Sequence, residues 1–450
     1  MIRHFSQRLM AASALLIATG LACGAQPPDV VASDPEGNTA MGTAALGGLQ
    51  SGTGNTASGY SALQFNSTGI YNTASGFEAL MFNTTGNFNT GFGFEVLNDV
   101  GAGSYNAAFG SGALGVSNGN YNTAVGSGAM ASTSTGDSNT AVGFEALSSV
   151  GTSSGNTAIG ASSMLSNKDG SRNTAAGQNS LNSNTTGNNN TAIGFGALTA
   201  NIDGNSNTAA GIDALNHNGT GYHNAALGAQ SLYANSAGTS NSALGFQALY
   251  SNTTGSNNIA VGLQAGYYVT TGSNNIHIGA AGAAADSGKI RIGTAGQQTE
   301  TFIAGIVGSK VTGAPVYITA NGQLGVLASS ERYKTAIAPI APASARLQQL
   351  RPVTFHLKND PQGPLQYGLI AEQVAKVYPE LVIRGEAGAI EGVRYDELAP
   401  ILLKQVQVQQ KQIGAQQQEL RDIKRQLAQL QGSMASFGPQ MRARGATESE

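Results

Sequence analysis

The sequence predicts a mainly β protein, with a long repetitive parallel β-roll or solenoid, a small α/β domain and a C-terminal coiled-coil helix. Three observations carry this prediction. An Asn recurs at nearly constant spacing along residues 38–279, Gly reaches 62 of 450 residues, and charge is unevenly distributed. Residues 37–280 contain 10 charged residues, whereas residues 281–450 contain 32. Two architectures therefore meet near residue 280.

The composition excludes several classes of protein. Only 10% of the residues are charged, against roughly a quarter in an ordinary soluble domain, which argues against a large conventional enzyme core. Gly does not recur at every third position and only 12 Pro are present, so the chain is not a collagen. The net charge of −3 offers no basic surface for nucleic acid or an anionic membrane. We expect no cofactor and no metal site.

Residues 1–25 have the pattern of an export signal. Arg3, His4 and Arg8 precede an apolar run over residues 9–22, which is too short for a convincing membrane span. Cys23, the only cysteine, ends this run and resembles the lipidated residue of a bacterial lipoprotein. Ordinary cleavage nearby is the alternative. The sequence thus predicts an exported protein that is either lipid-anchored at the outer membrane or secreted, with residues 26–36 as a linker.

The repeats occupy residues 37–280. Each Asn is followed four residues later by Gly, usually two residues later by Ala, and in thirteen copies eight residues later by Leu or Met. A repeat of 17 residues suits one coil of a solenoid, with Ala and Leu facing a thin core and the Asn side chains forming a ladder. So little apolar volume per coil predicts that several chains associate. The fifteen Asn positions are 38, 55, 72, 89, 106, 122, 139, 156, 173, 190, 207, 224, 241, 258 and 275.

These units resemble the head repeats of trimeric autotransporter adhesins, although those repeats are usually nearer 14 residues and their C-terminal membrane barrel has no counterpart here. The resemblance implies a homotrimeric β-roll that projects from a cell surface. Thr follows the Asn in ten copies. A solenoid face that binds ice, a glycan or another cell-surface ligand is therefore an alternative. His277, in the usual Ala position of the last copy, is expected to pack at the end of the ladder.

Residues 281–328 are expected to form a β-rich connector, and a series of motifs follows it. Ser329 is followed by Arg332 three residues later and Lys334 five residues later. The series resembles the C-terminal intramolecular chaperone domain of phage tail-spike and endosialidase proteins, over about residues 329–430. Further matches are Arg351-Pro352-Val353 with Phe355, the run from Tyr367 to Val374, the run from Tyr378 to Val382, and Tyr395 with Leu398.

The resemblance implies a domain, residues 329–400, that helps three chains to trimerise and then breaks the bond between Ala328 and Ser329. Ser329 would be the nucleophile, Lys334 its base and Arg332 a supporting cation. A Ser hydroxyl needs a neighbour to take its proton, and Lys can do so only when neutral. Ser330 stands where the family usually has an acidic residue. Burial created by assembly is expected to activate Lys334. The cleavage would occur once, in cis, with no external substrate.

The last segment has a heptad pattern. Val406, Ile413, Leu420 and Leu427 are spaced by seven, and Ile423 and Leu430 fill the alternate seam, so residues 401–431 are expected to form a coiled coil. Residues 432–450 are expected to be a disordered tail. The leading interpretation is an exported surface fibre with a self-cleaving trimerisation chaperone. The alternatives are a ligand- or ice-binding solenoid with a permanently attached trimerisation domain and a phage-type tail fibre.

Overall fold

A computed structural model describes residues 32–133, 135–304, 306, 315–319, 321–341, 344–385 and 388–444. The side chains of residues 133, 150, 344 and 435–444 are outside this description. The predicted export signal with Cys23, and the last six residues of the predicted tail, also lie outside the described residues. The chain divides into two compact units, residues 1–304 and 305–450, and each is described by itself.

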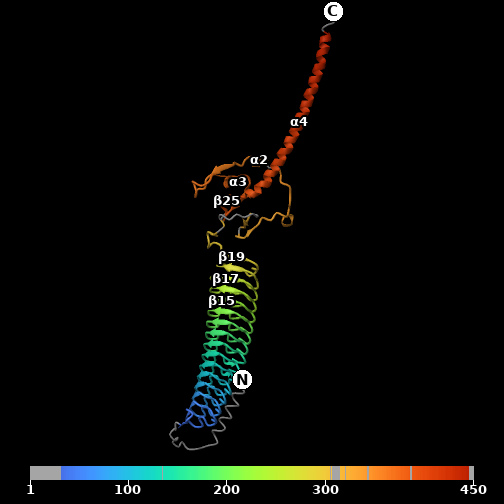
Figure 1. Cartoon of the computed structure of the whole chain (residues 1–450). Helices are drawn as coiled ribbons and strands as arrows, with labels where there is room; N and C mark the ends of the chain where they lie inside the picture. Colours follow the sequence, from blue (N-terminus) through green and yellow to red (C-terminus); the bar gives the residue numbers. More distant parts are fainter. Residues whose placement is uncertain are drawn as a thin grey trace, which may run out of the picture. The chain divides into compact units, whose positions relative to one another are not determined.

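The first unit is a parallel β-solenoid, as the repeats predict (Figure 1). Its main sheet has 17 strands. A repeat Asn immediately precedes every strand except the first and the last. Strand β1 (Ala32–Ser33) pairs antiparallel with β2, and the others are parallel and follow one another in chain order. These are β2 (Thr39–Met41), β3 (Thr56–Ser58), β4 (Thr73–Ser75), β5 (Thr90–Phe92), β6 (Ala107–Phe109), β7 (Thr123–Val125), β9 (Thr140–Val142), β11 (Thr157–Ile159), β12 (Thr174–Ala176), β13 (Thr191–Ile193), β14 (Thr208–Ala210), β15 (Ala225–Leu227), β16 (Ser242–Leu244), β17 (Ile259–Val261), β18 (Ile276–Ile278) and β19 (Ile290–Ile292).

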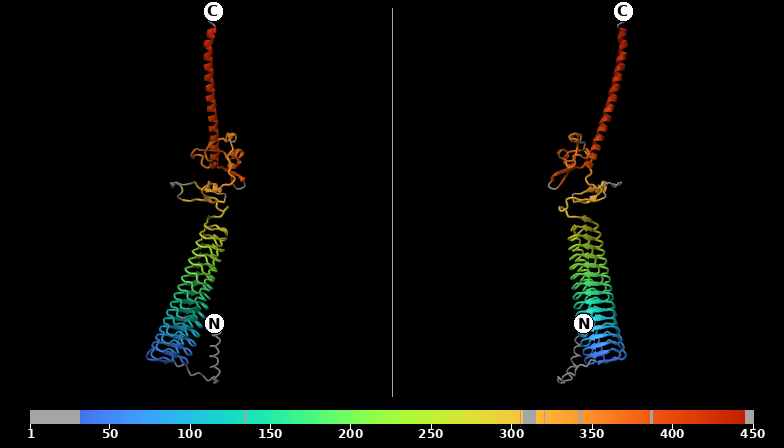
Figure 2. Two further views of the ribbon diagram at one scale, coloured as in Figure 1. Left: turned by 90° about the vertical axis from the view of Figure 1, so that its right-hand side faces the viewer. Right: turned by 60° about the vertical axis from the view of Figure 1, so that its left-hand side comes forward.

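The coils stack into one continuous column, seen in two further views in Figure 2. The shorter strands β8 (Ser132–Thr133) and β10 (Ser149–Val150) form a separate parallel pair in the turns. In the main sheet the middle residue of a strand faces inward, so that Ala124, Ala141 and Ala158 are fully buried. The Leu or Met of each repeat packs beside these Ala residues, and from Leu63 to Leu249 every one is fully buried. The predicted core positions are therefore confirmed.

The repeat Gly is required by both backbone and space. Gly194 has φ +130°, a conformation that residues with a Cβ rarely adopt. A Cβ there would also lie 2.6 Å from the carbonyl oxygen of Gly211 in the next coil. Coils stacked this closely leave no room for a side chain at the corner, which explains why Gly keeps its position in every repeat.

The predicted Asn ladder is present and buried. The backbone N–H of Asn190 donates to Oδ1 of Asn173 at 2.9 Å, and its Nδ2 donates to the carbonyl oxygen of Gly204 at 2.8 Å. Asn207 repeats the pattern on Oδ1 of Asn190 at 3.0 Å. Each amide thus satisfies backbone groups that would otherwise be buried without partners, which would cost about 1–3 kcal/mol each.

Further ladders were not predicted. A second buried Asn column includes Asn184, Asn201 and Asn218, in which Nδ2 of each residue donates to Oδ1 of the one before it. Aromatic rings also stack on the surface, with centroids 4.9–5.4 Å apart. The longest such ladder contains Tyr71, Phe88, Tyr105 and Tyr121. Because the rings cover each other's faces, they stabilise the stack of coils and leave mainly their edges to solvent.

The solenoid ends later than residue 280. Strand β19 pairs with β18 in the register Ile276 to Ile290, so the last coil contains 14 residues instead of 17. The segment expected to be purely connector therefore contributes one further coil. Its Asn position is occupied by Lys289, whose backbone N–H still donates to Oδ1 of Asn275 at 2.9 Å.

The second unit contains small antiparallel sheets and helices. Its core is small: Val374, Tyr378, Leu381 and Val382 are its buried hydrophobic residues within the described part of the chain. The paired strands are β20 (Tyr317–Ile318) with β21 (Leu324–Gly325), β22 (Val353–Phe355) with β23 (Gln366–Gly368), and β24 (Val382–Arg384) with β25 (Ile390–Val393). The helices are η1 (Glu331–Tyr333), α2 (Ser344–Leu347), α3 (Ala371–Val377), η2 (Pro379–Leu381) and α4 (Tyr395–Arg444).

Helix α4 includes the whole heptad segment and continues beyond it. The segment from residue 432 to Arg444, for which the sequence predicts disorder, is therefore helical. The side chains at the heptad positions, such as Ile413 (46% exposed) and Leu420 (51% exposed), lie on the surface of the single chain. Among the described residues, no helix is both long and apolar enough to cross a membrane.

Candidate functional site

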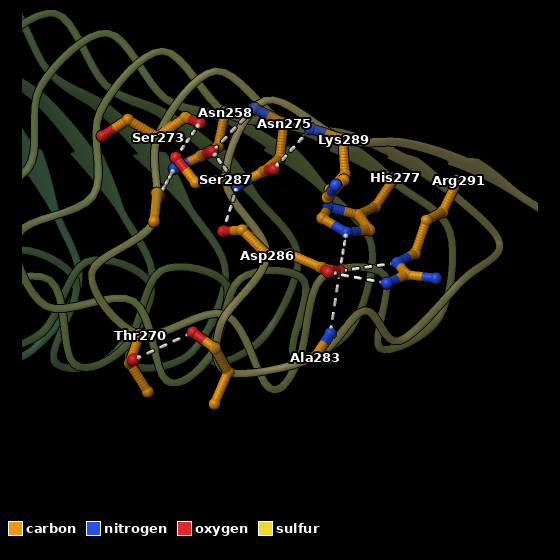
Figure 3. A network of polar contacts seen from close by, with 12 residues as sticks. Asn258, Thr270, Ser273, Asn275, His277, Ala283, Asp286, Ser287, Lys289 and Arg291 are labelled. Carbon is orange, nitrogen blue, oxygen red and sulfur yellow. Dashed lines mark hydrogen bonds and ion pairs between the residues drawn. The ribbon is translucent and has the colours of Figure 1, made fainter. Parts of the chain in front are cut away.

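A polar cluster of two buried residues and one half-exposed residue closes the C-terminal end of the solenoid (Figure 3). It joins His277 of β18, Arg291 of β19 and Asp286 of the loop between them. The Asp286 carboxylate accepts hydrogen bonds from Nε and Nη2 of Arg291, both at 2.6 Å, and from the backbone N–H of Ala283 at 2.9 Å. Nε2 of His277 lies 3.1 Å from the same carboxylate. His277 is fully buried, at the end of the ladder as predicted, whereas the roles of Asp286 and Arg291 were not predicted.

This cluster acts as a cap for the core. The hydrogen bonds from Arg291, reinforced by His277 and the Ala283 N–H, hold the pKa of Asp286 well below its ordinary value of 3.8, although burial opposes the shift. A carboxyl group with a depressed pKa in the folded state stabilises the fold above its unfolded pKa. That contribution is lost progressively as the pH falls below 3.8.

The Asp286→Asn variant should open the last coil. Removing one partner of a buried ion pair costs about 3–5 kcal/mol, and we expect about 2 kcal/mol here because Arg291 is half exposed. Trypsin cleavage after Lys289 and Arg291 should then be about 30-fold faster at pH 8, by the usual relation of free energy to population. The exposed carboxylate of Asp203 provides the control, Asp203→Asn, which should cleave like the wild type.

Hydrogen exchange of residues 272–293 checks the pH dependence. The difference in protection between wild type and Asp286→Asn should be large at pH 7, smaller at pH 3 and smaller again at pH 2. A difference that stays constant over this range would contradict the proposed role of the carboxylate.

The predicted catalytic pair meets in the second unit. Ser329 and Lys334 flank the single turn η1, in which the N–H of Tyr333 donates to the carbonyl of Ser330 at 3.0 Å and that of Lys334 to Glu331 at 2.9 Å. This turn brings the chain back on itself, and Nζ of Lys334 donates to Oγ of Ser329 at 3.1 Å. The spacing of five residues therefore produces a Ser–Lys contact of the length needed for proton transfer.

The surroundings of the pair are open. Every residue from 321 to 341 is exposed, including Ala328, Ser329 and Lys334. The guanidinium carbon of Arg332 lies 4.7 Å from the centre of the Tyr333 ring, a cation–π contact. An ammonium group cannot accept a proton, and only burial or a neighbouring cation favours the neutral form of Lys. The single chain supplies no burial at this point.

The other predicted motif residues build the small domain that follows. Val353 and Phe355 lie on β22, which pairs with the strand that contains Tyr367. The hydroxyl of Tyr395 accepts a hydrogen bond from the backbone N–H of Leu369 at 2.7 Å and so ties the start of α4 to the end of β23. Arg346 reaches the other side of the core, with its guanidinium 4.0 Å from the centre of the Tyr378 ring.

The described residues contain no group of three or more His, Cys, Asp or Glu side chains that could hold a metal ion. In the described part of the solenoid, the polar clusters are ladders and the Asp286 cap, and their members are satisfied mainly by one another and by the backbone. Ser329 and Lys334 therefore remain the candidate site for chemistry.

Comparison with known proteins supports the C-terminal assignment. Residues 329–383 match the family model Peptidase_S74, described as chaperone of endosialidase. Neither the curated proteins nor the solved structures yield a match to this chain. The match begins at Ser329 itself and covers β22, β23, α3 and the start of β24. The second unit of this β-solenoid protein therefore carries a chaperone domain of the endosialidase type.

Proposed function

We propose that the chain is an exported surface fibre whose C-terminal domain brings three copies together and then cuts itself off before Ser329. The observation that carries the proposal is the coincidence of two features at Ser329. The family match starts at Ser329, and the hydroxyl of that residue accepts a hydrogen bond from Lys334 at 3.1 Å. This coincidence favours a chemical role for the pair over an ordinary surface contact.

The proposed reaction breaks the peptide bond between Ala328 and Ser329. Lys334, when neutral, takes the proton of the Ser329 hydroxyl, whose oxygen attacks the carbonyl carbon of Ala328. The C–N bond breaks, the nitrogen of Ser329 takes a proton, and an ester links Ala328 to Oγ of Ser329. Water then hydrolyses the ester. The products are a carboxylate at Ala328 and a fragment that begins at Ser329.

The exposed apolar residues around the pair support assembly as the trigger. Val326 is 65% exposed, Leu327 57% and Tyr333 64% in the single chain, and all three lie within a few residues of Ser329 in the sequence. Such a concentration of exposed apolar side chains is typical of a surface that another chain covers. Association would desolvate Lys334 and favour its neutral form, so that cleavage would follow correct assembly.

We also propose that the protein is exported. The charged residues and apolar run of residues 1–25 support export, and Cys23 supports a lipid anchor in the outer membrane, with secretion after ordinary cleavage as the other route. The free solenoid surface would then face outward, where a cell surface or glycan is the ligand class we propose.

The oligomeric mass of the full mature protein tests the assembly. Sedimentation at micromolar concentration should give three copies of the solenoid. A monomer at every accessible concentration would overturn the proposed trimeric fibre, whatever the fate of the bond before Ser329.

A further inference from the structure

One face of the solenoid is uncharged along its entire length. The first and third residues of each parallel strand, β2 to β7, β9 and β11 to β19, point away from the core, and none of these outward residues is charged. The charged residues of the solenoid between positions 37 and 280, such as Glu95, Asp137 and Lys168, all lie outside these strands. We define the outward residues of these strands as the strand face.

The third positions form a column in register from coil to coil, and its side chains are apolar in every coil except those of Ser58 and Ser75. Val125 pairs with Val142, Leu244 pairs with Val261, and Ile278 pairs with Ile292. These side chains are substantially exposed: Ile159 47%, Ile193 50% and Leu244 51%. The exposed members are Met41, Phe92, Phe109, Val125, Val142, Ile159, Ile193, Leu227, Leu244, Val261, Ile278 and Ile292.

The first positions complete the face. They carry mostly Thr from β2 to β14 and Ile in the last three strands, β17 to β19. Near the end of the solenoid both columns are therefore apolar: Ile259 is 43% exposed and Ile290 70% exposed. The absence of charge together with exposed apolar side chains in most coils is typical of an interface core rather than of a solvated face.

The spacing of the side chains in this column indicates which partner covers it. The column presents one side chain per coil over the whole sheet. A partner can contact it along its full length only if that partner has the same rise per coil. A second copy of this solenoid has that rise, about 4.8 Å. Fifteen steps give about 70 Å. With a width of about 10 Å, the face offers about 700 Å² per copy, or about 350 Å² toward each of two neighbours, compared with roughly 800 Å² per partner in a standard pairwise interface.

We infer that the strand face is where copies of this solenoid pack against one another, parallel and in register around a common axis. Parallel register brings like residues together, so that the Ile-rich end meets its counterpart and the Ser58 and Ser75 coils meet theirs. An antiparallel arrangement would place these small polar coils against the Ile-rich end. This inference rests on the proposed trimer and specifies its interface. It also removes the Thr column from the surface available to ice.

Thiol cross-linking in the full chain tests the register. With a short bifunctional maleimide, the Ile193→Cys variant should form linked species at least tenfold faster than Ile202→Cys. Ile202 is equally exposed, 52%, but lies in a turn position where another coil carries Lys168. Cys23 is common to both variants. Assembly into three copies with equal, slow cross-linking of both variants would overturn this inference and leave the trimer proposal intact. A monomeric protein would overturn both.

A pair of charge variants provides a second measurement. Ile193→Lys with Leu244→Lys places charges on the strand face, and the concentration at which half the protein is assembled should rise at least about tenfold, since like charges then meet across the interface. The control, Ile202→Lys with Tyr222→Lys, adds the same charge and removes exposed apolar residues on other faces. An equal effect of the two variants, or inhibition of ice recrystallisation by the assembled wild type, would contradict the inference.

Discussion

Ser329→Ala should leave the chain uncut under conditions in which the wild type yields a C-terminal fragment of residues 329–450. The change removes Oγ of Ser329, which accepts a hydrogen bond from Nζ of Lys334 at 3.1 Å. Ala has no group that can attack the preceding carbonyl. Loss of a nucleophile typically lowers a rate by about 10⁴-fold or more. Intact mass and a denaturing gel of the two proteins side by side give the result directly.

Ser330→Ala is the matched control, because Ser330 is the adjacent exposed hydroxyl and contributes its backbone carbonyl, not its side chain, to the turn before Lys334. It should cleave at a rate within a few-fold of the wild type. A fragment that starts at position 329 in the Ser329→Ala protein, or one that disappears only in Ser330→Ala, would exclude Ser329 as the nucleophile. An uncut wild type would leave a permanently attached trimerisation domain.

The period of the sequence predicted most of the solenoid because every coil has the same requirements for core packing and hydrogen bonding. Ala at the middle of a strand and Leu eight residues after the Asn must fit a thin core, and the Asn must bond to the coil before it, so their spacing identifies the coil. The sequence did not predict the coil over residues 281–293 because this last coil meets the same packing and hydrogen-bonding requirements with other residues. It places Lys289 at the Asn position and closes the core with Asp286 and Arg291.

The sequence predicted the contact between Ser329 and Lys334 but not the exposure of the residues around them. A single turn over Glu331–Tyr333 suffices to bring Lys334 back to Ser329, so the spacing alone implies that the two can meet. Whether Lys334 is buried depends on side chains far away in the sequence or, in the proposed trimer, on other chains, and the local spacing does not encode that. Helix α4 also continues beyond residue 432, although that segment contains Gly432, Gly438 and Pro439. Gly and Pro disfavour a helix interior, so local propensity does not predict this part of the helix.

Charges in the seam of α4 should stop both assembly and cleavage. Ile413 and Leu420 are half exposed in the single chain and are spaced by seven, as a seam between helices requires. The variant Ile413→Asp with Leu420→Asp would place like charges together in every copy of the bundle, which disfavours association. The protein should then sediment as a monomer, and the fragment 329–450 should form at least about 100-fold more slowly, because Lys334 stays in water.

The control for this variant is Ala415→Asp with Ala428→Asp, which adds the same charge to the same helix outside the seam. It should assemble and cleave like the wild type. The comparison separates two chemical possibilities. If cleavage depends on desolvation of Lys334 by neighbouring chains, the rate must follow the assembled fraction across both variants and across dilution of the wild type. If instead the monomeric seam variant cleaves at the wild-type rate, the pair is active in the exposed turn of a single chain, and assembly plays no part in its activation.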